Sequence, residues 1–519
     1  MKPLPIGITS LKKIHDKDMA YVDKTGIIES MTNIGGYYFL SRPRRFGKSL
    51  LVDTFKELFE GNEPLFMGKA IHNKWDWSKK YPVIKIDWAS GIVKTRAALD
   101  KKIIHLLQEN ATHLGVTLDL EDEVSTLFEK LISGTAEKHK MPVVVLVDEY
   151  DKPMLDNIET PEITFEIREG LKNLYSVLKK MDEHLHFVFL TGVSKFSKVN
   201  IFSGVNNLND LTLDPNYATI CGYTHRDLET VFAEHLAGVD WEELQRWYNG
   251  YNFLGDAVYN PFDILLFISE GQRYRNFWFE TGTPSFLVRL MQKNRYFLPD
   301  LENIEAGEEL LSSFEVDTLQ PVTLLFQTGY LSIKGTEVRR TRTIYHLGFP
   351  NLEVKNAFTD FLITSYTHAA QEKVRLSDST WDALRLADMP ALESTIRRLF
   401  AGIPWRNFTN NDLTDFEGFY ASVLYAYFSA ATATVIPEDT SSHGQADMTV
   451  QLEKNIYVME IKVIPGELPE GGPNTALEQI QSRGYAEKYR EKTGGRLFEL
   501  GLIFSQAKRN LVRFDFIEL

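Results

Sequence analysis

The sequence predicts an α/β protein in three parts: a parallel sheet flanked by helices, an α-rich middle, and a second α/β domain with a mixed sheet. Two observations carry this prediction. Strand-like and helix-like segments alternate over about the first 200 residues, which is typical of a parallel sheet covered on both faces. The last hundred or so residues instead hold three successive strand-like segments, a helix and two more strands. We place the boundaries at 1–215, 216–403 and 404–519.

The N-terminal strands are expected where short apolar runs are rich in β-branched or aromatic residues. VVVLV, for example, has the composition of a buried parallel strand. Helices are expected at amphipathic stretches such as KSLLVDTFKELFEG, which Gly61 closes. The expected strands are 35–41, 81–90, 143–147 and 186–194, and the expected helices are 48–61, 94–109, 121–139 and 161–182.

The middle part is dominated by helical segments such as HRDLETVFAEHL and WEELQRWYNGY. A local strand pair is expected near 324–335 and 342–351. In the C-terminal part we expect helices at 412–430 and 474–490, and strands at 431–437, 445–452, 455–463, 496–505 and 511–519.

Composition narrows the class of protein. A chain of 519 residues is too long for one core, so several domains are expected. The net charge of −14 argues against binding nucleic acid by bulk attraction, although it leaves room for a local basic groove. The single cysteine, Cys221, excludes an internal disulfide and fits a reducing cytosol. With neither a signal peptide nor an apolar run of transmembrane length, we expect a cytoplasmic protein with no membrane partner.

The stretch SRPRRFGKSLL (41–51) lies between a predicted strand and a predicted helix, as a phosphate-binding P-loop does. Arg42 stands where the GxxxxGK[ST] pattern has its first Gly, so the strict pattern fails at one position. Gly47 allows close backbone approach, Lys48 can reach the β- and γ-phosphates, and Ser49 can ligate Mg²⁺. The alternative is an arginine-rich surface turn. We also expect nucleotide contacts from the loop residues Arg44, Arg45, Phe46 and Leu50.

A second motif favours the nucleotide site. VVVLVDEYDKP places Asp148 and Glu149 at the carboxyl end of a buried strand. Asp148 could hold Mg²⁺ through water, and Glu149 could polarise an attacking water. The alternative is that both acids are solvated loop residues.

A third strand, HFVFLTGVS, carries Thr191 at its end. In P-loop NTPases of the additional-strand type, a polar residue at this place senses the γ-phosphate. Thr191 is a candidate for that role, and the alternative is an ordinary β-branched strand residue. These segments together predict a P-loop parallel sheet that binds ATP with Mg²⁺.

The segments YVDKTG, SRPRRFGKSL, VLVDEYDKP, LTGVSKFS and YNGYNF resemble the bacterial AAA-ATPase-like proteins, which carry RPRRFGKS in place of the usual loop. The resemblance covers roughly residues 3–265 and implies that the first Gly of the loop pattern is absent from this chain. Arg42, Arg44 and Arg45 are expected to touch phosphates or to bridge to another domain or subunit. Because ATPases of this type often need a neighbour's arginine, self-association is an expected possibility.

The C-terminal part holds a second constellation of charged residues. If 445–452 and 455–463 form a hairpin turning at Glu453–Lys454, opposed residue numbers sum to 907, and Asp447 faces Glu460. Lys462 then shares the face of Glu460. Two opposed carboxylates destabilise a sheet unless a divalent cation compensates. The alternative is a solvated strand face with alternating charges.

Two flanking features extend this constellation. Glu417 lies on a largely apolar helical face, and Gln481 and Tyr485 are spaced i, i+4 on the next helix. An acid, D…ExK and QxxxY in this order resemble a PD-(D/E)XK nuclease-like domain, with which the AAA-ATPase-like family typically ends. The resemblance implies Glu417, Asp447 and Glu460 as metal ligands, and Asp447, Glu460, Lys462, Gln481 and Tyr485 as catalytic residues.

The sequence therefore predicts an ATP-binding and ATP-hydrolysing protein with a Mg²⁺- or Mn²⁺-dependent nuclease-like domain. The expected partner is nucleic acid, DNA rather than RNA. One alternative is a nucleotide-dependent switch or scaffold whose nuclease-like domain binds without cleaving. Another is an ATPase motor or chaperone subunit.

Overall fold

The computed structural model of the chain describes residues 1–202, 205, 207–277, 291, 296–302, 304–311, 320–367, 370–403, 417–431, 433–468, 472–490 and 494–519. Contacts within the chain divide it into two compact units, which are described separately. Unit 1 comprises Met1–Phe277 and Glu305–Leu352, and unit 2 comprises Trp278–Ile304 and Glu353–Leu519. None of the helices in the described residues is long and apolar enough to cross a bilayer.

Unit 1 is built on a sheet of five strands in the order β2-β3-β4-β1-β5, and every neighbouring pair in it is parallel. Its strands are β1 (Gly36–Ser41), β2 (Val83–Asp87), β3 (Val143–Asp148), β4 (Leu185–Gly192) and β5 (Leu208–Asp210). All residues of β3 are buried, as its apolar composition predicts. Because β4 separates β1 from β3, the additional-strand parallel sheet is confirmed.

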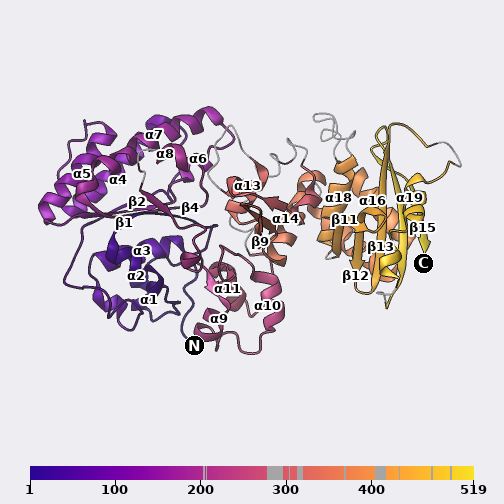
Figure 1. Cartoon of the computed structure of the whole chain (residues 1–519), viewed down its shortest axis with the longest axis horizontal. Helices are drawn as coiled ribbons and strands as arrows, with labels where there is room; N and C mark the ends of the chain where they lie inside the picture. The colour runs from indigo at the N-terminus through magenta and orange to yellow at the C-terminus, as the bar shows by residue number, and fades with distance from the viewer. Residues whose placement is uncertain are drawn as a thin grey trace. The chain divides into compact units, whose positions relative to one another are not determined.

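Helices cover both faces of this sheet (Figure 1). On one face lie α1 (Leu11–Asp16), α2 (Thr25–Ile34) and α3 (Lys48–Phe59), and on the other α4 (Arg96–Leu114), α5 (Val124–His139) and α7 (Pro161–Lys180). Helix boundaries follow local signals. Thr95 caps the start of α4 with its side chain, and Gly115, in a left-handed conformation, ends it.

The rest of unit 1 consists of short helices and two small sheets. The helices are α6 (Lys152–Leu155), α8 (Lys198–Ile201), α9 (His225–Val231), α10 (Trp241–Tyr248), α11 (Pro261–Ser269) and α13 (Pro321–Thr328). The strands are β6 (Tyr223–Thr224), β7 (Val258–Tyr259), β8 (Ile304–Ala306), β9 (Ser332–Arg339) and β10 (Arg342–Gly348). The expected strand pair is β9 and β10, but the start of its first segment is wrong. Residues 324–328 belong to α13, which Gly329 ends with a φ of 91°.

Unit 2 holds a second sheet of five strands in the order β11-β12-β13-β14-β15. Its strands are β11 (Thr434–Ser441), β12 (Gly444–Leu452), β13 (Asn455–Ile464), β14 (Leu497–Ser505) and β15 (Asn510–Glu518). The pair β13–β14 is parallel and the other pairs are antiparallel, so the predicted mixed sheet is confirmed.

The helices of unit 2 are α14 (Leu352–Thr367), α15 (Ala370–Leu386), α16 (Met389–Ala401), α18 (Glu417–Ala430) and α19 (Thr475–Arg483). Phe400 of α16 and Tyr420 of α18 both contact the ring of Phe504 in β14, so these two helices share one face of the sheet. Helix α19 lies on the other face, against Gly501. Residues 412–416 of the expected first helix lie outside the described residues. The helix expected at 474–490 ends early, because Gly484 adopts a left-handed φ of 60°.

Candidate functional site

The loop between β1 and α3 has the form of a phosphate-binding loop. Gly47 precedes the first residue of α3 with a φ of 91°, a conformation that glycine adopts without steric cost. The neighbouring Arg45 also has a left-handed φ, of 67°. Phe46 is buried, whereas Arg44, Arg45 and Gly47 are exposed. The loop therefore presents its backbone and two guanidinium groups outward at the N-terminus of α3, where an anion is favoured.

Lys48 lies inside this loop. Its side chain is almost fully buried, and Nζ donates to the carbonyl oxygens of Arg42 and Pro43 at 2.9 and 2.8 Å. Burial lowers the pKa of Lys48, although the carboxylates of Asp148 and Glu149 partly offset this effect. The predicted phosphate-binding lysine is thus held by the loop backbone, near enough to the acids at the end of β3 for their charges to counteract the lowering of its pKa. Ser49 and Leu50 follow it in the first turn of α3, both half-buried.

Arg42, in place of the first glycine of the pattern, is part of the protein core. It is fully buried, and its guanidinium donates to the carbonyl oxygens of Ser41 and Thr212, both at 2.9 Å, and of Tyr217 at 3.1 Å. It also lies 3.9 Å from the centre of the Phe253 ring. Burial lowers its pKa to about 10, so the group stays charged at neutral pH. Arg42 therefore fixes the start of the loop to the backbone at Thr212 and Tyr217.

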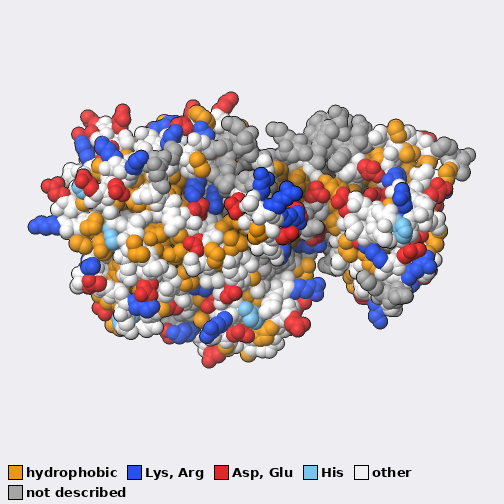
Figure 2. Space-filling view, viewed as in Figure 1, with side chains coloured by type: hydrophobic (Ala, Val, Ile, Leu, Met, Phe, Trp, Pro, Cys, Tyr) orange, Lys and Arg blue, Asp and Glu red, His pale blue; other side chains and the backbone are white. Residues whose placement is uncertain are grey.

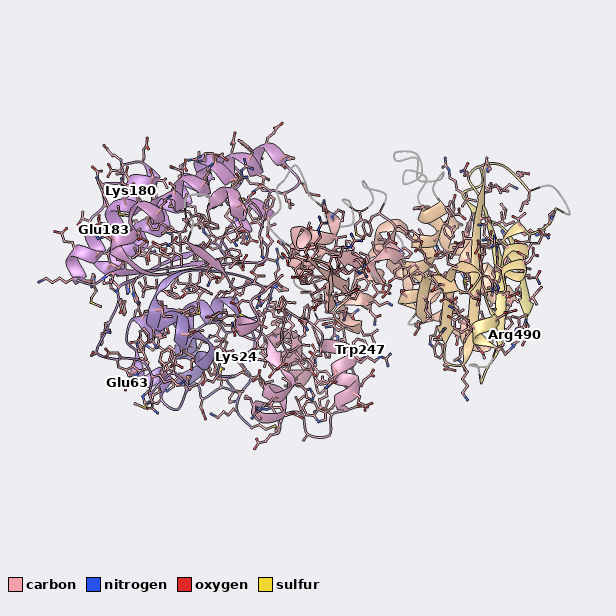
Figure 3. All side chains as sticks on the ribbon, viewed as in Figure 1. Lys24, Glu63, Lys180, Glu183, Trp247 and Arg490 are labelled. Carbon is pink, nitrogen blue, oxygen red and sulfur yellow. The ribbon has the colours of Figure 1, made fainter. Side chains whose placement is uncertain are left out.

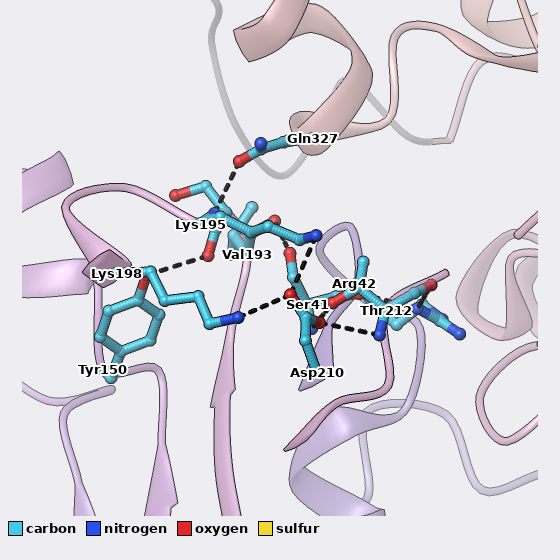
Figure 4. A network of polar contacts seen from close by, with 10 residues as sticks. Ser41, Arg42, Tyr150, Val193, Lys195, Lys198, Asp210, Thr212 and Gln327 are labelled. Atoms are coloured by element: carbon cyan, nitrogen blue, oxygen red, sulfur yellow. Dashed lines mark hydrogen bonds and ion pairs between the residues drawn. The ribbon is translucent and has the colours of Figure 1, made fainter. Parts of the chain in front are cut away.

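A polar network surrounds this anchor (Figure 4). Nζ of Lys195 and Nζ of Lys198 both pair with Oδ2 of Asp210, at 3.0 and 2.6 Å. Burial alone would raise the pKa of Asp210, but the two lysines hold it below its usual range. The backbone N–H of Lys195 donates to Oε1 of Gln327 at 2.6 Å, which ties the segment after β4 to α13.

The ends of β3 and β4 meet at a carboxylate–hydroxyl pair. Oγ1 of Thr191 donates to Oδ1 of Asp148 at 2.6 Å, and both side chains are buried. Oδ2 of Asp148 is also buried and has no hydrogen-bond partner among the described residues. A buried carboxylate oxygen without a donor is costly. A divalent cation, held directly or through water, fits this atom.

Glu149, the next residue, has a backbone conformation that non-glycine residues seldom adopt, with a φ of 58°. Burial raises the pKa of its side chain, and Lys48 partly offsets this rise. Strained backbone at a functional position is held in place by the surrounding structure. This left-handed residue directly follows Asp148, the last residue of β3.

Asp151 is a functional candidate that sequence reasoning missed. Its buried carboxylate accepts hydrogen bonds from the backbone N–H groups of Val193 and Ser194, at 3.2 and 2.7 Å, and from the hydroxyl of Ser194 at 2.7 Å. It thereby ties the segment after β3 to the segment after β4. The signal was available, since the motif VDEYDKP contains a third acid two residues after Glu149.

A hollow of about 520 Å³, partly open to solvent, adjoins the loop. Its lining combines Phe46, Gly47 and Leu50 with Lys24 and Cys221. Lys24, labelled in Figure 3, pairs with Asp227 of α9 at 2.6 Å. This ion pair joins the segment before α2 to α9.

The hairpin of β12 and β13 has the predicted register. Opposed residues run from Leu452–Asn455 to Met448–Met459, all summing to 907. The ladder ends one step before Asp447 and Glu460. Instead, Oδ2 of Asp447 accepts the backbone N–H of Ile461 at 2.7 Å. The two carboxylates are still close enough that Asp447 raises the pKa of Glu460.

Glu460 is the most perturbed acid of this hairpin. It is 1% exposed, and Oε1 accepts from Nζ of Lys462 at 2.9 Å and from the side-chain amide of Gln479. Burial, followed by the charge of Asp447, raises its pKa to about 7. Oε2 is buried without a hydrogen-bond partner in the part of the chain that the structure describes. A hard cation fits this oxygen, since it would satisfy the orphaned atom and lower the raised pKa.

Glu417 lies at the margin of this group. Its side chain is 50% exposed, and Oε1 is 3.8 Å from Nζ of Lys462. Burial raises the pKa of Glu417, and Lys462 partly offsets this rise. Among the described residues, no three His, Cys, Asp or Glu side chains form a ready set of metal ligands. Nζ of Lys462 lies within ion-pair distance of both Glu417 and Glu460.

The expected pairing of Gln481 with Tyr485 on one helical face is wrong. Helix α19 ends at Arg483, so Tyr485 lies beyond it, and Gln481 is exposed. The amide near Glu460 belongs to Gln479, which also lies 3.5 Å from the hydroxyl of the buried Tyr485. Two signals point to Gln479. It falls on the same helical face as the apolar Ala476 and Ile480, and Gly484 marks the end of the helix.

The distance between α19 and the sheet is set by Gly501 of β14. A Cβ atom at this position would lie 2.5 Å from the backbone nitrogen of Leu477 and 2.7 Å from Oδ1 of Asn474, the N-cap of α19. Gly501 is the residue paired with Glu460 across β13 and β14. Close approach of the helix at this point brings Gln479 over the carboxylate.

Comparison with known proteins agrees with this geometry. Residues 5–202 match the family model described as Predicted AAA-ATPase, and residues 415–514 match that of the PD-(D/E)XK nuclease superfamily. A protein of Azotobacter chroococcum mcd 1, described as an uncharacterized protein in the vnfD 5′ region, is 46% identical over 514 residues, which are 99% of this chain and 98% of that protein.

A solved structure, that of the Aeropyrum pernix ORC1 protein in complex with DNA, is similar at 13% identity with a TM-score of 0.27. The match covers 66% of this chain and 94% of that one. The identity and coverage of the Azotobacter protein, together with the two family models, establish the relationship of the chain. It belongs to the family of that Azotobacter protein, with an AAA-ATPase-like domain at its N-terminus and a domain of the PD-(D/E)XK nuclease superfamily at its C-terminus.

Proposed function

We propose that this protein binds and hydrolyses ATP and cleaves phosphodiester bonds of nucleic acid at a metal-dependent site in its C-terminal domain. Mg²⁺ is the proposed cation at both sites, and Mn²⁺ is a further candidate at the nuclease site. ATP would control cleavage, so that nucleotide state and nuclease activity are coupled.

The observation that carries the nuclease proposal is the state of Glu460. One of its oxygens accepts two donors, the other is buried without a donor, and its pKa is raised to about 7. A bound divalent cation would polarise the scissile phosphate and lower the pKa of a bound water. Asp447 and Glu460 would hold it. Lys462 would stabilise negative charge on the phosphate, and Gln479 would keep the carboxylate of Glu460 oriented.

The nucleotide proposal is supported by the placement of Lys48 against Asp148 and Glu149. Lys48 would bind phosphate oxygens, and Ser49 and Oδ2 of Asp148 would hold Mg²⁺. Glu149, whose pKa is raised by burial, would accept a proton from the attacking water. Because Thr191 already donates to Asp148, it would act by orienting that carboxylate as well as by sensing phosphate.

One observation favours the alternative of a switch or scaffold that binds nucleic acid without cleaving it. No ready set of three metal-ligating side chains occurs among the residues that the structure describes. Retained nucleic-acid affinity without cleavage in any divalent metal would favour this alternative.

The test is cleavage of labelled single- and double-stranded DNA and RNA in Mg²⁺ and in Mn²⁺, with ATP, ADP, a non-hydrolysable ATP analogue or no nucleotide. We expect Glu460→Gln to abolish cleavage and Lys48→Ala to abolish its dependence on ATP. Glu467→Gln, at a side chain that is 71% exposed, is the matched control for the first variant, and Lys12→Ala, at an exposed lysine of α1, for the second. Equal cleavage by wild type and Glu460→Gln would contradict the assigned site. Equal cleavage in every nucleotide state would contradict the coupling.

A further inference from the structure

The hairpin of β9 and β10 carries an exposed basic tip. Arg339 and Arg342 form the last pair of the ladder, so the loop consists of Arg340 and Thr341 alone. All residues from 336 to 342 are exposed. Figure 2 shows Lys and Arg side chains gathered on the viewed face, in the region where Figure 1 draws β9.

The three arginines of this tip have different partners. The guanidinium of Arg339 pairs with Glu305 at 2.7 Å and with Glu337 at 2.9 Å, so its charge is balanced and its side chain is fixed. Arg340 and Arg342 form no ion pair and no side-chain hydrogen bond with any residue that the structure describes. Two arginines therefore extend from the end of the hairpin with their charges uncompensated, on a chain whose net charge is −14.

The composition of the loop is poor for the turn that it makes. Arg340 has a left-handed φ of 59°, at the first of two loop positions, where glycine is usual in hairpins of this length. Beside it, Val338 exposes 73% of its surface. A lone exposed Val is ordinary in a strand, so the strained position of Arg340 is the informative feature. Such strain at an exposed arginine supports a role for its side chain outside the fold.

We propose that the tip of this hairpin, residues 338–342, is a binding site for the phosphate backbone of duplex nucleic acid. A guanidinium matches the geometry of phosphate oxygens, and a two-stranded ribbon fits the major groove. Since the net charge of the chain repels a polyanion, attraction must come from local groups such as Arg340 and Arg342. The proposal takes its partner class from the proposed nuclease function and adds a second contact, in unit 1.

The test measures binding of a labelled DNA duplex to the full chain by fluorescence anisotropy, between 50 and 200 mM salt. Every protein carries Glu460→Gln so that the duplex stays intact. Arg340→Gln with Arg342→Gln is compared with Lys12→Gln and Lys13→Gln, which remove the same charge from exposed positions of α1 in the same unit. Two lost phosphate contacts should lower the salt slope by about 2 and remove about a tenfold change in affinity over this range.

The outcomes separate this proposal from the proposed function. If the starting protein binds the duplex and the double variant Arg340→Gln with Arg342→Gln binds it equally well, the hairpin is not a contact and the nuclease proposal stands. If the starting protein does not bind the duplex, the hairpin site is wrong, and cleavage of single-stranded DNA and RNA then decides the proposed nuclease function. If the double lysine variant weakens binding as much as the double arginine variant, the effect comes from net charge and the hairpin site is wrong.

A second variant excludes a merely structural role for Arg340. Arg340→Gly removes the charge but relieves the left-handed backbone, so the melting temperature should stay the same or rise while duplex affinity falls. A fall in both would mean that Arg340 supports the fold, and would overturn its assignment as a contact.

Discussion

The side-chain amide of Gln479 donates to Oε1 of Glu460, whereas Gln481, two residues later on the same helix, is exposed to solvent. The amide orients a carboxylate that also accepts from Lys462. Loss of one donor leaves a buried carboxylate oxygen less well satisfied and free to rotate.

Gln479→Ala should therefore reduce nucleic-acid cleavage by at least about tenfold, since small misplacements at reacting groups carry large rate penalties. Gln481→Ala is the matched control and should cleave at the wild-type rate. Single-turnover cleavage in Mg²⁺ measures both. A loss confined to Gln481→Ala would restore the pairing that the sequence suggested and contradict the assignment of Gln479.

The raised pKa of Glu460 predicts a pH dependence of stability. Because the folded protein binds this proton more tightly than the unfolded chain, stability is highest below the ordinary pKa of about 4.5 and falls as the pH rises to about 7. The difference in melting temperature between wild type and Glu460→Gln, in metal-free buffer, isolates this contribution. We expect Glu460→Gln to become the more stable of the two as the pH rises through this window, and a constant difference would contradict the assignment.

Mg²⁺ should offset the loss of stability that ionisation of Glu460 causes as the pH rises. Protonation of Glu460 competes with the cation, so Mg²⁺ should raise the melting temperature of wild type more at pH 8 than at pH 5.5. Because the proposed nucleotide site would also hold Mg²⁺ through Ser49, both proteins carry Ser49→Ala and are measured without ATP. Glu460→Gln in the same background should lose the pH-dependent part of the Mg²⁺ effect.

Restoring the strict loop pattern should harm this protein. Arg42→Gly removes a buried guanidinium that accounts for hydrogen bonds to three carbonyl groups, and we expect a loss of about 2–4 kcal/mol in the free energy of unfolding. Arg44→Gly, at an exposed position of the same loop, controls for the added backbone freedom. Denaturant titration compares the two. Equal stability of the two variants would show that the guanidinium does not hold the loop.

Asp151 should affect ATP turnover more than ATP binding. Asp151→Asn replaces an acceptor of three hydrogen bonds with a group that donates at one end, which loosens the segment after β4. We expect kcat for ATP hydrolysis to fall about tenfold or more with little change in KM, because this segment follows Thr191. Asp156→Asn, at a residue that pairs with Lys152, is the matched control. An unchanged kcat would remove Asp151 from the list of positioning residues.

The features that could be predicted from the sequence are those fixed by local pattern. Buried strands such as VVVLV are marked by composition, and the register of β12 and β13 follows from the turn at Glu453–Lys454. The placement of Asp148 at the end of β3 follows from strand polarity alone. These predictions use neighbouring residues only and need no knowledge of contacts between distant segments.

The features that could not be predicted depend on contacts between segments far apart in the chain. The role of Arg42 rests on the carbonyl groups of Thr212 and Tyr217, about 170 residues away. The spacing of Gln481 and Tyr485 predicts Gln481 near the acids, but the packing of α19 on β14 sets which face of the helix approaches Glu460. Even there, the glycine that ends the helix at position 484 was visible in the sequence.

Because Gly501 has no side chain, α19 packs directly on the backbone of β14 at this position. A single methyl group at this position would push the helix away from the sheet and move Gln479 away from Glu460. Neither of these two side chains would itself be changed. The C-terminal domain therefore contains a position, Gly501, at which one added carbon atom would change the distance between Gln479 and Glu460 without altering the acids or Lys462.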